Sequence, residues 1–134
     1  MKKITALISI FILTSCHYSK DKLVIKNNSK LIICYETLIK NRTAYYQISG
    51  GGKIKSFSFD SPPVRGNSNS IKYALENESI DKILYVVYYD LKDLEYVNKN
   101  LNTIISNKNF QTDTYTLKEL NSLNWEINFP NKVK

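Results

Sequence analysis

Histidine and cysteine are scarce in this sequence of 134 residues, which contains one His and two Cys. A Ser or Cys nucleophile needs a nearby base, usually a histidine, and the one histidine, His17, lies near the N-terminus. A structural zinc site needs about four Cys or His ligands. The composition therefore argues against a hydrolase triad and against a zinc centre, and we expect neither a metal nor a cofactor.

The sequence also lacks a long hydrophobic run. Residues 4–13 (ITALISIFIL) are apolar or small and carry no charge, but a membrane-spanning helix needs roughly 20 such residues. Two lysines precede this run, and Thr14 and Ser15 follow it. A basic start, a short apolar run and small residues at its end are typical of a secretory signal peptide. We therefore leave residues 1–15 out of the fold.

The end of this segment, Leu13-Thr14-Ser15-Cys16, resembles the lipobox of bacterial lipoproteins. The resemblance implies that signal peptidase II cuts before Cys16 and that its thiol carries lipid. Stable anchoring takes two acyl signals, which a diacylglyceryl thioether and an acylated amine would supply. The chain then divides into a signal peptide (1–15), a lipidated tether (16–22) and one domain (23–134). An ordinary secretory signal, with Cys16 incidental, is the alternative.

The residue after Cys16 is His17 and not the aspartate that retains enterobacterial lipoproteins in the inner membrane. This comparison favours the bacterial cell envelope, at the outer membrane facing the periplasm. The chain has 19 basic and 12 acidic residues, and without Lys2 and Lys3 the counts are 17 and 12, a net charge of +5. Such a surplus suits acidic partners; the alternative is solvated lysines that only keep a small protein soluble. After Lys3 the lysines are scattered singly, so we expect no nucleic-acid partner.

The remaining pattern predicts a single compact α+β domain with an antiparallel-rich sheet and one or two short helices. Apolar alternation and β-branched or aromatic residues predict strands at residues 23–25, 31–35, 43–48, 53–59, 83–89, 110–115 and 125–129. The run at 83–89 (ILYVVYY) is apolar on both faces, as a central strand is. A slip in the alternation between Ile54 and Phe57 suggests a bulge. Gly50-Gly51-Gly52 predicts a flexible turn, and Glu76 and Glu78 are expected in a surface loop.

Two helices are predicted. Apolar residues recur at helical spacing through residues 92–106, and Thr116 with Glu119 forms a capping box that opens a second, short helix. Trp125 should be buried, with Ile127 and Phe129 on its face. Residues 115–130 (YTLKELNSLNWEINFP) also resemble the C-terminal end of small lipoproteins from Bacteroidetes-type bacteria; this resemblance implies a compact domain and no particular activity.

Tyrosine is the residue in excess, with ten copies. Adjacent strand residues face opposite ways, so the pairs Tyr45-Tyr46 and Tyr88-Tyr89 should each bury one ring and expose the other. Exposed rings near lysines suit protein or glycan contacts, which makes Tyr46 and Tyr88 candidate binding residues; the alternative is ordinary, half-covered strand tyrosines. Cys34 lies in an apolar run and should be a small buried hydrophobe without a disulfide.

Three acids, Asp90, Asp93 and Glu95, follow the central strand. They can cap the next helix and favour its dipole, or they can be catalytic or bind calcium.

Taken together, the lipobox and the lack of a catalytic or metal-ligand set predict a membrane-anchored, non-enzymatic binding or accessory module, a class that includes immunity-type inhibitors and glycan- or protein-binding domains. The alternative is a small carboxylate-dependent enzyme of the envelope.

The lipobox leads to the first prediction. In a bacterial host, Cys16→Ala should abolish incorporation of labelled palmitate, because the variant lacks the thiol that carries the lipid. The measurement is metabolic labelling followed by gel fluorography, with Cys34→Ala as the matched control that keeps its label. Label retained by Cys16→Ala would contradict the assignment.

Overall fold

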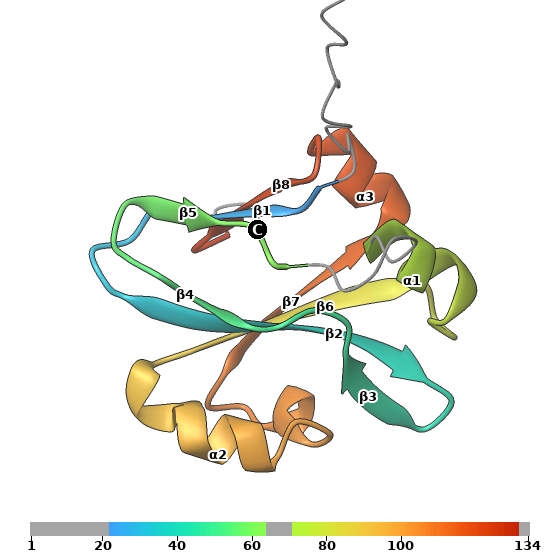
Figure 1. Ribbon diagram of the computed structural model, residues 1–134, viewed down its shortest axis with the longest axis horizontal. Helices are drawn as coiled ribbons and strands as arrows, with labels where there is room; N and C mark the ends of the chain where they lie inside the picture. The colour runs from blue at the N-terminus through green and yellow to red at the C-terminus, as the bar shows by residue number, and fades with distance from the viewer. Residues whose placement is uncertain (1–21, 64–70, 132–134) are drawn as a thin grey trace, which may run out of the picture.

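The computed structural model describes residues 22–63 and 71–131, which form two β-sheets and a helical layer (Figure 1). The predicted signal peptide and Cys16 lie outside the described residues. Among the residues described, no helix has the length and the apolar character needed to cross a bilayer.

The larger sheet is built around two long neighbouring strands, β2 (Ile33–Asn41) and β6 (Ile83–Tyr89). On the far side of β2, its two halves pair with different strands, β3 (Ala44–Gln47) and β4 (Gly52–Ile54). On the far side of β6 lies β7 (Gln111–Thr116). All these pairs are antiparallel, and the prediction that residues 83–89 form a central strand is confirmed.

The smaller sheet brings together the two ends of the domain. Its middle strand, β1 (Val24–Asn27), pairs antiparallel with β5 (Ser58–Asp60) and parallel with β8 (Glu126–Phe129). Figure 1 shows this sheet above the larger one, with α3 (Leu117–Ser122) and α1 (Ile71–Asn77) beside it and α2 (Leu94–Lys99) below. The predicted α+β class and the antiparallel-rich pairing are confirmed.

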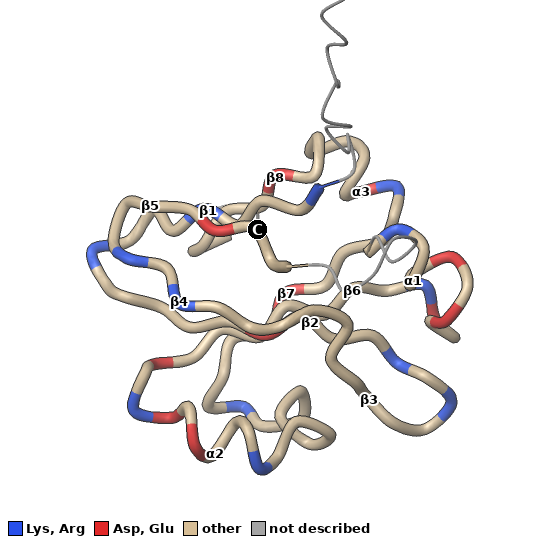
Figure 2. Tube along the Cα trace, in the orientation of Figure 1, with Lys and Arg blue, Asp and Glu red and all other residues tan. Residues whose placement is uncertain are grey.

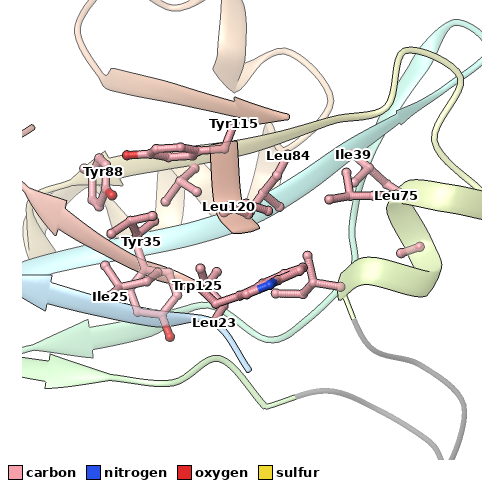
Figure 3. Close-up of a cluster of buried hydrophobic side chains, with 14 of the residues drawn as sticks. Leu23, Ile25, Tyr35, Ile39, Leu75, Leu84, Tyr88, Tyr115, Leu120 and Trp125 are labelled. Atoms are coloured by element: carbon pink, nitrogen blue, oxygen red, sulfur yellow. The ribbon is translucent and has the colours of Figure 1, made fainter. Parts of the chain in front are cut away.

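Alternation along β2 and β6 fills two cores, one on each face of the larger sheet. The first core lies between the two sheets and includes Tyr35, Tyr88 and Leu120 (Figure 3). The second is smaller and lies on the face covered by α2, where Leu38 and Val87 pack with Val97. Because strand side chains alternate between faces, the buried residues of the pair are directed in turn into one core and then the other. All of β6 is apolar or aromatic, and β2 is apolar except for Glu36, Thr37 and its last two residues.

The predicted capping box is present. Thr116 Oγ1 accepts a hydrogen bond from the backbone N–H of Glu119 at 3.3 Å, and the Glu119 carboxylate accepts one from the Thr116 N–H at 2.7 Å. Both bonds satisfy donors that would otherwise be free at the start of α3. The bond from the Thr116 N–H, together with one that the Thr116 hydroxyl donates to the same carboxylate at 2.8 Å, lowers the pKa of the Glu119 carboxyl.

The single helix predicted over residues 92–106 is wrong. The segment forms a 3₁₀ turn, η1 (Leu91–Asp93), then α2, then a second 3₁₀ turn, η2 (Ile104–Ser106). At the end of α2 the Asn100 amide donates to the Tyr96 carbonyl at 2.8 Å, and the Asn100 backbone N–H bonds Val97 instead of continuing the helix. Asparagine competes in this way with helical hydrogen bonding.

Residues 53–59 do not form one bulged strand. The segment turns at Phe57, whose φ is 51°, and its two halves join different sheets as β4 and β5. Phe57 and Phe59 are therefore exposed, although Ile54 is buried. Residues 71–77 form α1, so the expectation that Glu76 lies in a loop is also wrong.

Trp125 occupies the first core, as predicted, just before β8. Its side chain is buried with Ile127, Phe129 packs against the same cluster, and the indole Nε1 donates to Asn121 Oδ1 at 3.0 Å. The Trp125 backbone adopts a φ of 60°, which is uncommon for a bulky residue. Burial of a large ring with its one donor satisfied makes this residue a main contributor to stability.

Trp125→Ala should lower the free energy of unfolding by about 3–5 kcal/mol, because it removes a buried aromatic ring and leaves a cavity. Urea denaturation followed by circular dichroism measures the loss. Leu123→Ala, at a nearby exposed residue, is the control and should change stability far less. Indole fluorescence typical of full exposure to water in the folded native chain would contradict the placement.

Candidate functional site

The two tyrosine pairs differ in their burial. The expectation that Tyr88-Tyr89 exposes one ring is wrong, since Tyr88 is 3% and Tyr89 6% exposed. The reason is that β6 is covered on both faces: Tyr88 packs on Phe129 in the first core, with ring centroids 4.6 Å apart, and Tyr89 lies in the second core. Tyr88 therefore offers no ring at the surface for a partner.

Tyr45 and Tyr46 are both half-buried on β3, which is at the edge of the larger sheet. The Tyr46 hydroxyl donates to Glu78 Oε2 at 3.0 Å, and burial together with this bond raises the pKa of Tyr46 to about 12. Tyr45 packs edge-on against Tyr85 at 5.1 Å, with Lys40 Nζ 5.8 Å from its ring centroid. The lysine therefore lies beside Tyr45 and not beside Tyr46, the residue chosen from the sequence. The expectation that this pair buries one ring and exposes the other is also wrong, because both rings lie on an edge strand that is partly covered.

A groove of about 530 Å³ runs between β3 and the segment that follows α2. Its lining consists of Tyr45, Tyr46 and Gln47 on one side and residues 98–103 on the other. Adjacent strand side chains face opposite ways, so three consecutive residues can line one groove only if the strand's backbone edge takes part. Within the described residues β3 pairs with β2 alone, so this edge is free.

The chemistry of the groove is that of amides, hydroxyls and one cation. Four amide side chains line it (Gln47, Asn98, Asn100 and Asn102), together with Thr103 and Lys99, and none of its described lining residues is acidic. Lys99 also forms an exposed ion pair with Glu95 at 2.6 Å. The site therefore combines neutral donors and acceptors, the aromatic surface of Tyr45 and a free strand edge, and is suited to hold a polar ligand.

A buried carboxylate lies next to one wall of the groove. Glu36, on the second-core face of β2, is 3% exposed. The Gln47 amide donates to Glu36 Oε2, and the Tyr89 hydroxyl donates to Oε1 at 3.0 Å. Burial raises the pKa of the Glu36 carboxyl, and the two donated bonds offset part of this effect. Gln47 thus connects the groove with a carboxylate beneath it.

The glycine run closes over this carboxylate and is not simply a flexible turn. A Cβ on Gly51 would lie 2.1 Å from Glu36 Oε1, and one on Gly52 would lie 2.7 Å from the Tyr35 hydroxyl. No side chain beyond hydrogen fits at either place, and Gly52 begins β4. Sequence reasoning missed Glu36; a single acid inside the apolar run of β2 was the available signal.

The three acids singled out in the sequence are solvated. Asp90 pairs with Lys92 at 3.6 Å and Glu95 with Lys99, all through side chains that are more than half exposed. Asp90 and Asp93 occupy N-cap positions, but neither side chain makes the capping hydrogen bond that was expected. Over residues 22–63 and 71–131, no group of three or more His, Cys, Asp or Glu side chains is arranged to hold a metal ion.

Cys34 is a free, buried thiol in the second core, as predicted. Burial raises the pKa of this thiol, which disfavours the reactive thiolate. Its place beside Leu38 and Val87 is that of a small apolar side chain.

Glu36→Gln should change how stability depends on pH. Burial raises the pKa of Glu36, so as the pH rises above the ordinary glutamate value of about 4.3 the unfolded chain loses this proton before the folded chain does. The free energy of unfolding contributed by this group therefore falls through that window. Wild type should lose stability relative to Glu36→Gln as the pH rises above the ordinary glutamate value, measured by urea denaturation.

The control for this series is Glu76→Gln, which changes an exposed glutamate of α1 and should follow wild type. Parallel pH profiles for wild type and Glu36→Gln would show that the buried carboxyl ionises freely.

Comparison of the chain with protein-family models, with curated proteins and with solved structures finds no match. The groove at β3, and the buried Glu36 beside it, are therefore the features on which a functional proposal for this chain rests.

Proposed function

We propose that the chain is a lipid-anchored protein of the bacterial envelope, held at the outer membrane through Cys16, whose domain binds a partner and does not catalyse a reaction. The observation that carries the binding role is the groove between β3 and residues 98–103. A tether supports this role because it raises the local concentration of a binding domain at the membrane surface.

The free edge of β3 favours an extended protein segment as the partner. Such a segment adds to an exposed strand through main-chain hydrogen bonds and places alternate side chains in neighbouring pockets. The register supports this mode: the Ile48 N–H points to β2, where it bonds the Thr37 carbonyl at 3.2 Å, so the N–H groups of Tyr45 and Gln47 point outward to the groove. The amides that line the opposite wall would bond the segment's outer edge. A glycan, stacked on Tyr45 and bonded by the same amides, is the other occupant that this chemistry suits.

The alternative function, a small carboxylate-dependent enzyme, has one specific observation in its favour. Glu36 is a buried carboxyl with a raised pKa that contacts a groove residue, and such groups are found at catalytic sites. Against this, both Glu36 oxygens already accept hydrogen bonds, and Gly51 lies directly over the carboxylate. We assign Glu36 to positioning Gln47 on the groove wall.

The binding role is tested by site-specific photo-crosslinking in the living host. A crosslinking residue at Asn98 or Asn102, both exposed on the groove, should capture a discrete partner, and Tyr45→Ala should reduce that product. The matched control is Lys118, which is exposed on α3, away from the groove. Equal capture from Lys118, or none from the groove positions, would count against the proposal.

Carboxylate variants in the same host test the enzymatic alternative. If the domain only binds, alanine at Asp90, Asp93 or Glu95 should leave the envelope phenotype intact in variants that keep their fold by circular dichroism. Glu36→Gln should do the same, because its amide oxygen can still accept the hydrogen bond from Gln47. Loss of the phenotype in one folded carboxylate variant, with the groove crosslink unchanged, would replace binding with carboxylate chemistry.

A further inference from the structure

The groove between β3 and residues 98–103 has two walls that are almost free of charge. Residues 43–52 on one side and residues 100–107 on the other contain no acidic or basic residue, and Figure 2 shows β3 and the segment after α2 in tan. Lys99 is the only cation in the described lining, and its Nζ already lies 2.6 Å from Glu95 Oε1. Recognition of a partner in this groove must therefore come mainly from neutral hydrogen bonds.

The amide of Gln47 is held in one orientation by the carboxyl group beneath it. Its Nε2 donates to Glu36 Oε2, and the other carboxyl oxygen accepts a bond from the Tyr89 hydroxyl at 3.0 Å. A carboxylate accepts hydrogen bonds and has none to donate, so the nitrogen of the amide lies against Glu36 and the oxygen does not. Because the two atoms lie on opposite sides of the amide carbon, Gln47 Oε1 is directed away from Glu36 and is left for a ligand in the groove.

Two side chains on the opposite wall also use a donor within the protein. The Asn100 amide donates to the Tyr96 carbonyl at 2.8 Å, and the Thr103 hydroxyl donates to the Asn100 carbonyl at 3.2 Å. A threonine hydroxyl has one proton to donate, so Thr103 Oγ1 in this arrangement can only accept a further bond. Among the described residues, no group donates to Gln47 Oε1, Asn100 Oδ1 or Thr103 Oγ1.

These three oxygens, one on the β3 wall and two on the wall opposite, are acceptors that water or a partner's donor must satisfy. Asn98 and Asn102 also line the groove, and their exposed amides can turn either way. A carboxylate placed against the three oxygens has no proton to donate and leaves them unpaired, which is unfavourable once water is displaced. An amide or a hydroxyl can donate to them and can also accept from the remaining N–H groups of the walls.

We infer that the groove selects its partner by hydrogen-bond donors: it takes an extended segment that presents neutral amide or hydroxyl side chains, those of Asn, Gln, Ser and Thr, and discriminates against carboxylates at the same places. Gln47, Asn100 and Thr103 set this specificity, and Glu36 contributes by orienting Gln47. The inference rests on the proposed function for its occupant, an extended segment along the edge of β3. The partner is thus neutral where it meets the groove, in contrast to the acidic partner that the overall charge of the chain suits.

Peptide selection followed by isosteric replacement tests this specificity. The chain without its predicted signal peptide, residues 16–134 with Cys16→Ser, contains every described helix and strand. A phage-displayed library of linear heptapeptides is selected on this protein, and the best-bound peptide is synthesised with isosteres in which Asn becomes Asp, Gln becomes Glu or Thr becomes Val. At a position that faces the walls, the isostere should bind about tenfold more weakly in fluorescence anisotropy, because one acceptor is left unpaired.

Variants of the protein locate the effect on the walls. Thr103→Val and Gln47→Met keep the size of exposed side chains but remove the acceptor, so the peptide and the isostere that lacks the facing donor should then bind equally. Thr103→Ser, which keeps the hydroxyl, should restore the difference. Ser122→Ala is the matched control: Ser122 is exposed on α3, and its hydroxyl likewise donates to the carbonyl three residues earlier, that of Glu119 at 2.8 Å.

Two results would overturn the inference and leave the groove as a binding site. One is enrichment of peptides rich in Asp or Glu, or equal binding of the amide and carboxylate isosteres to wild type. The other is a difference between isosteres that persists unchanged in both Thr103→Val and Gln47→Met, which would place the discrimination elsewhere. Absence of any enriched peptide would overturn the extended segment as the partner, and the inference with it.

Discussion

The antiparallel pairing of β2 with β6 is the interaction on which the other parts of this domain depend. Their facing residues, from Cys34 opposite Tyr89 to Leu38 opposite Tyr85, form a ladder whose two faces are both covered. One face is closed by the small sheet with α1 and α3, and the other by α2 and the turns that flank it. Burial on both faces explains why β6 is apolar or aromatic throughout, and it means that a polar side chain in the buried part of β2 needs hydrogen-bond partners.

Glu36 is the main exception, and the surrounding structure is arranged to accommodate it. A carboxylate removed from water is unfavourable unless its oxygens accept hydrogen bonds, and Gln47 and Tyr89 supply one to each oxygen. The Gly51 backbone lies so close to that carboxylate that a Cβ on this residue would be 2.1 Å from Glu36 Oε1, and it therefore covers the carboxylate on that side. The Gln47 bond adds to the backbone ladder that holds the edge strand β3, and with it the groove wall, against β2.

Much of the fold can be predicted from local patterns, because those patterns report constraints acting over a few residues. The capping box at Thr116, the central strand at 83–89 and the burial of Trp125 all follow from spacing and composition. The errors arise where distant contacts decide. Tyr88 and Tyr89 face opposite ways, as neighbours in a strand do, but both faces of their strand are covered by distant segments. Residues 53–59 alternate as one strand, but they turn at Phe57, so that the first half pairs with β2 and the second half with β1. The groove joins β3 to a segment fifty residues further along the chain, so no local signal marks it.

The position of β1 has a mechanical consequence. The chain enters the domain at Leu23 and continues directly into this strand, which is bonded on one side to β5 and on the other to β8. Hydrogen bonds from Val24 N–H to the Trp125 carbonyl and from Asn28 N–H to the Phe129 carbonyl close the parallel ladder at both ends. A pull from the N-terminal side acts along β1, across the direction of its hydrogen bonds, so the bonds of both ladders share the load and must yield together. A domain attached through β1 in this way resists tension in shear, and the strands on both sides of β1 contribute to that resistance.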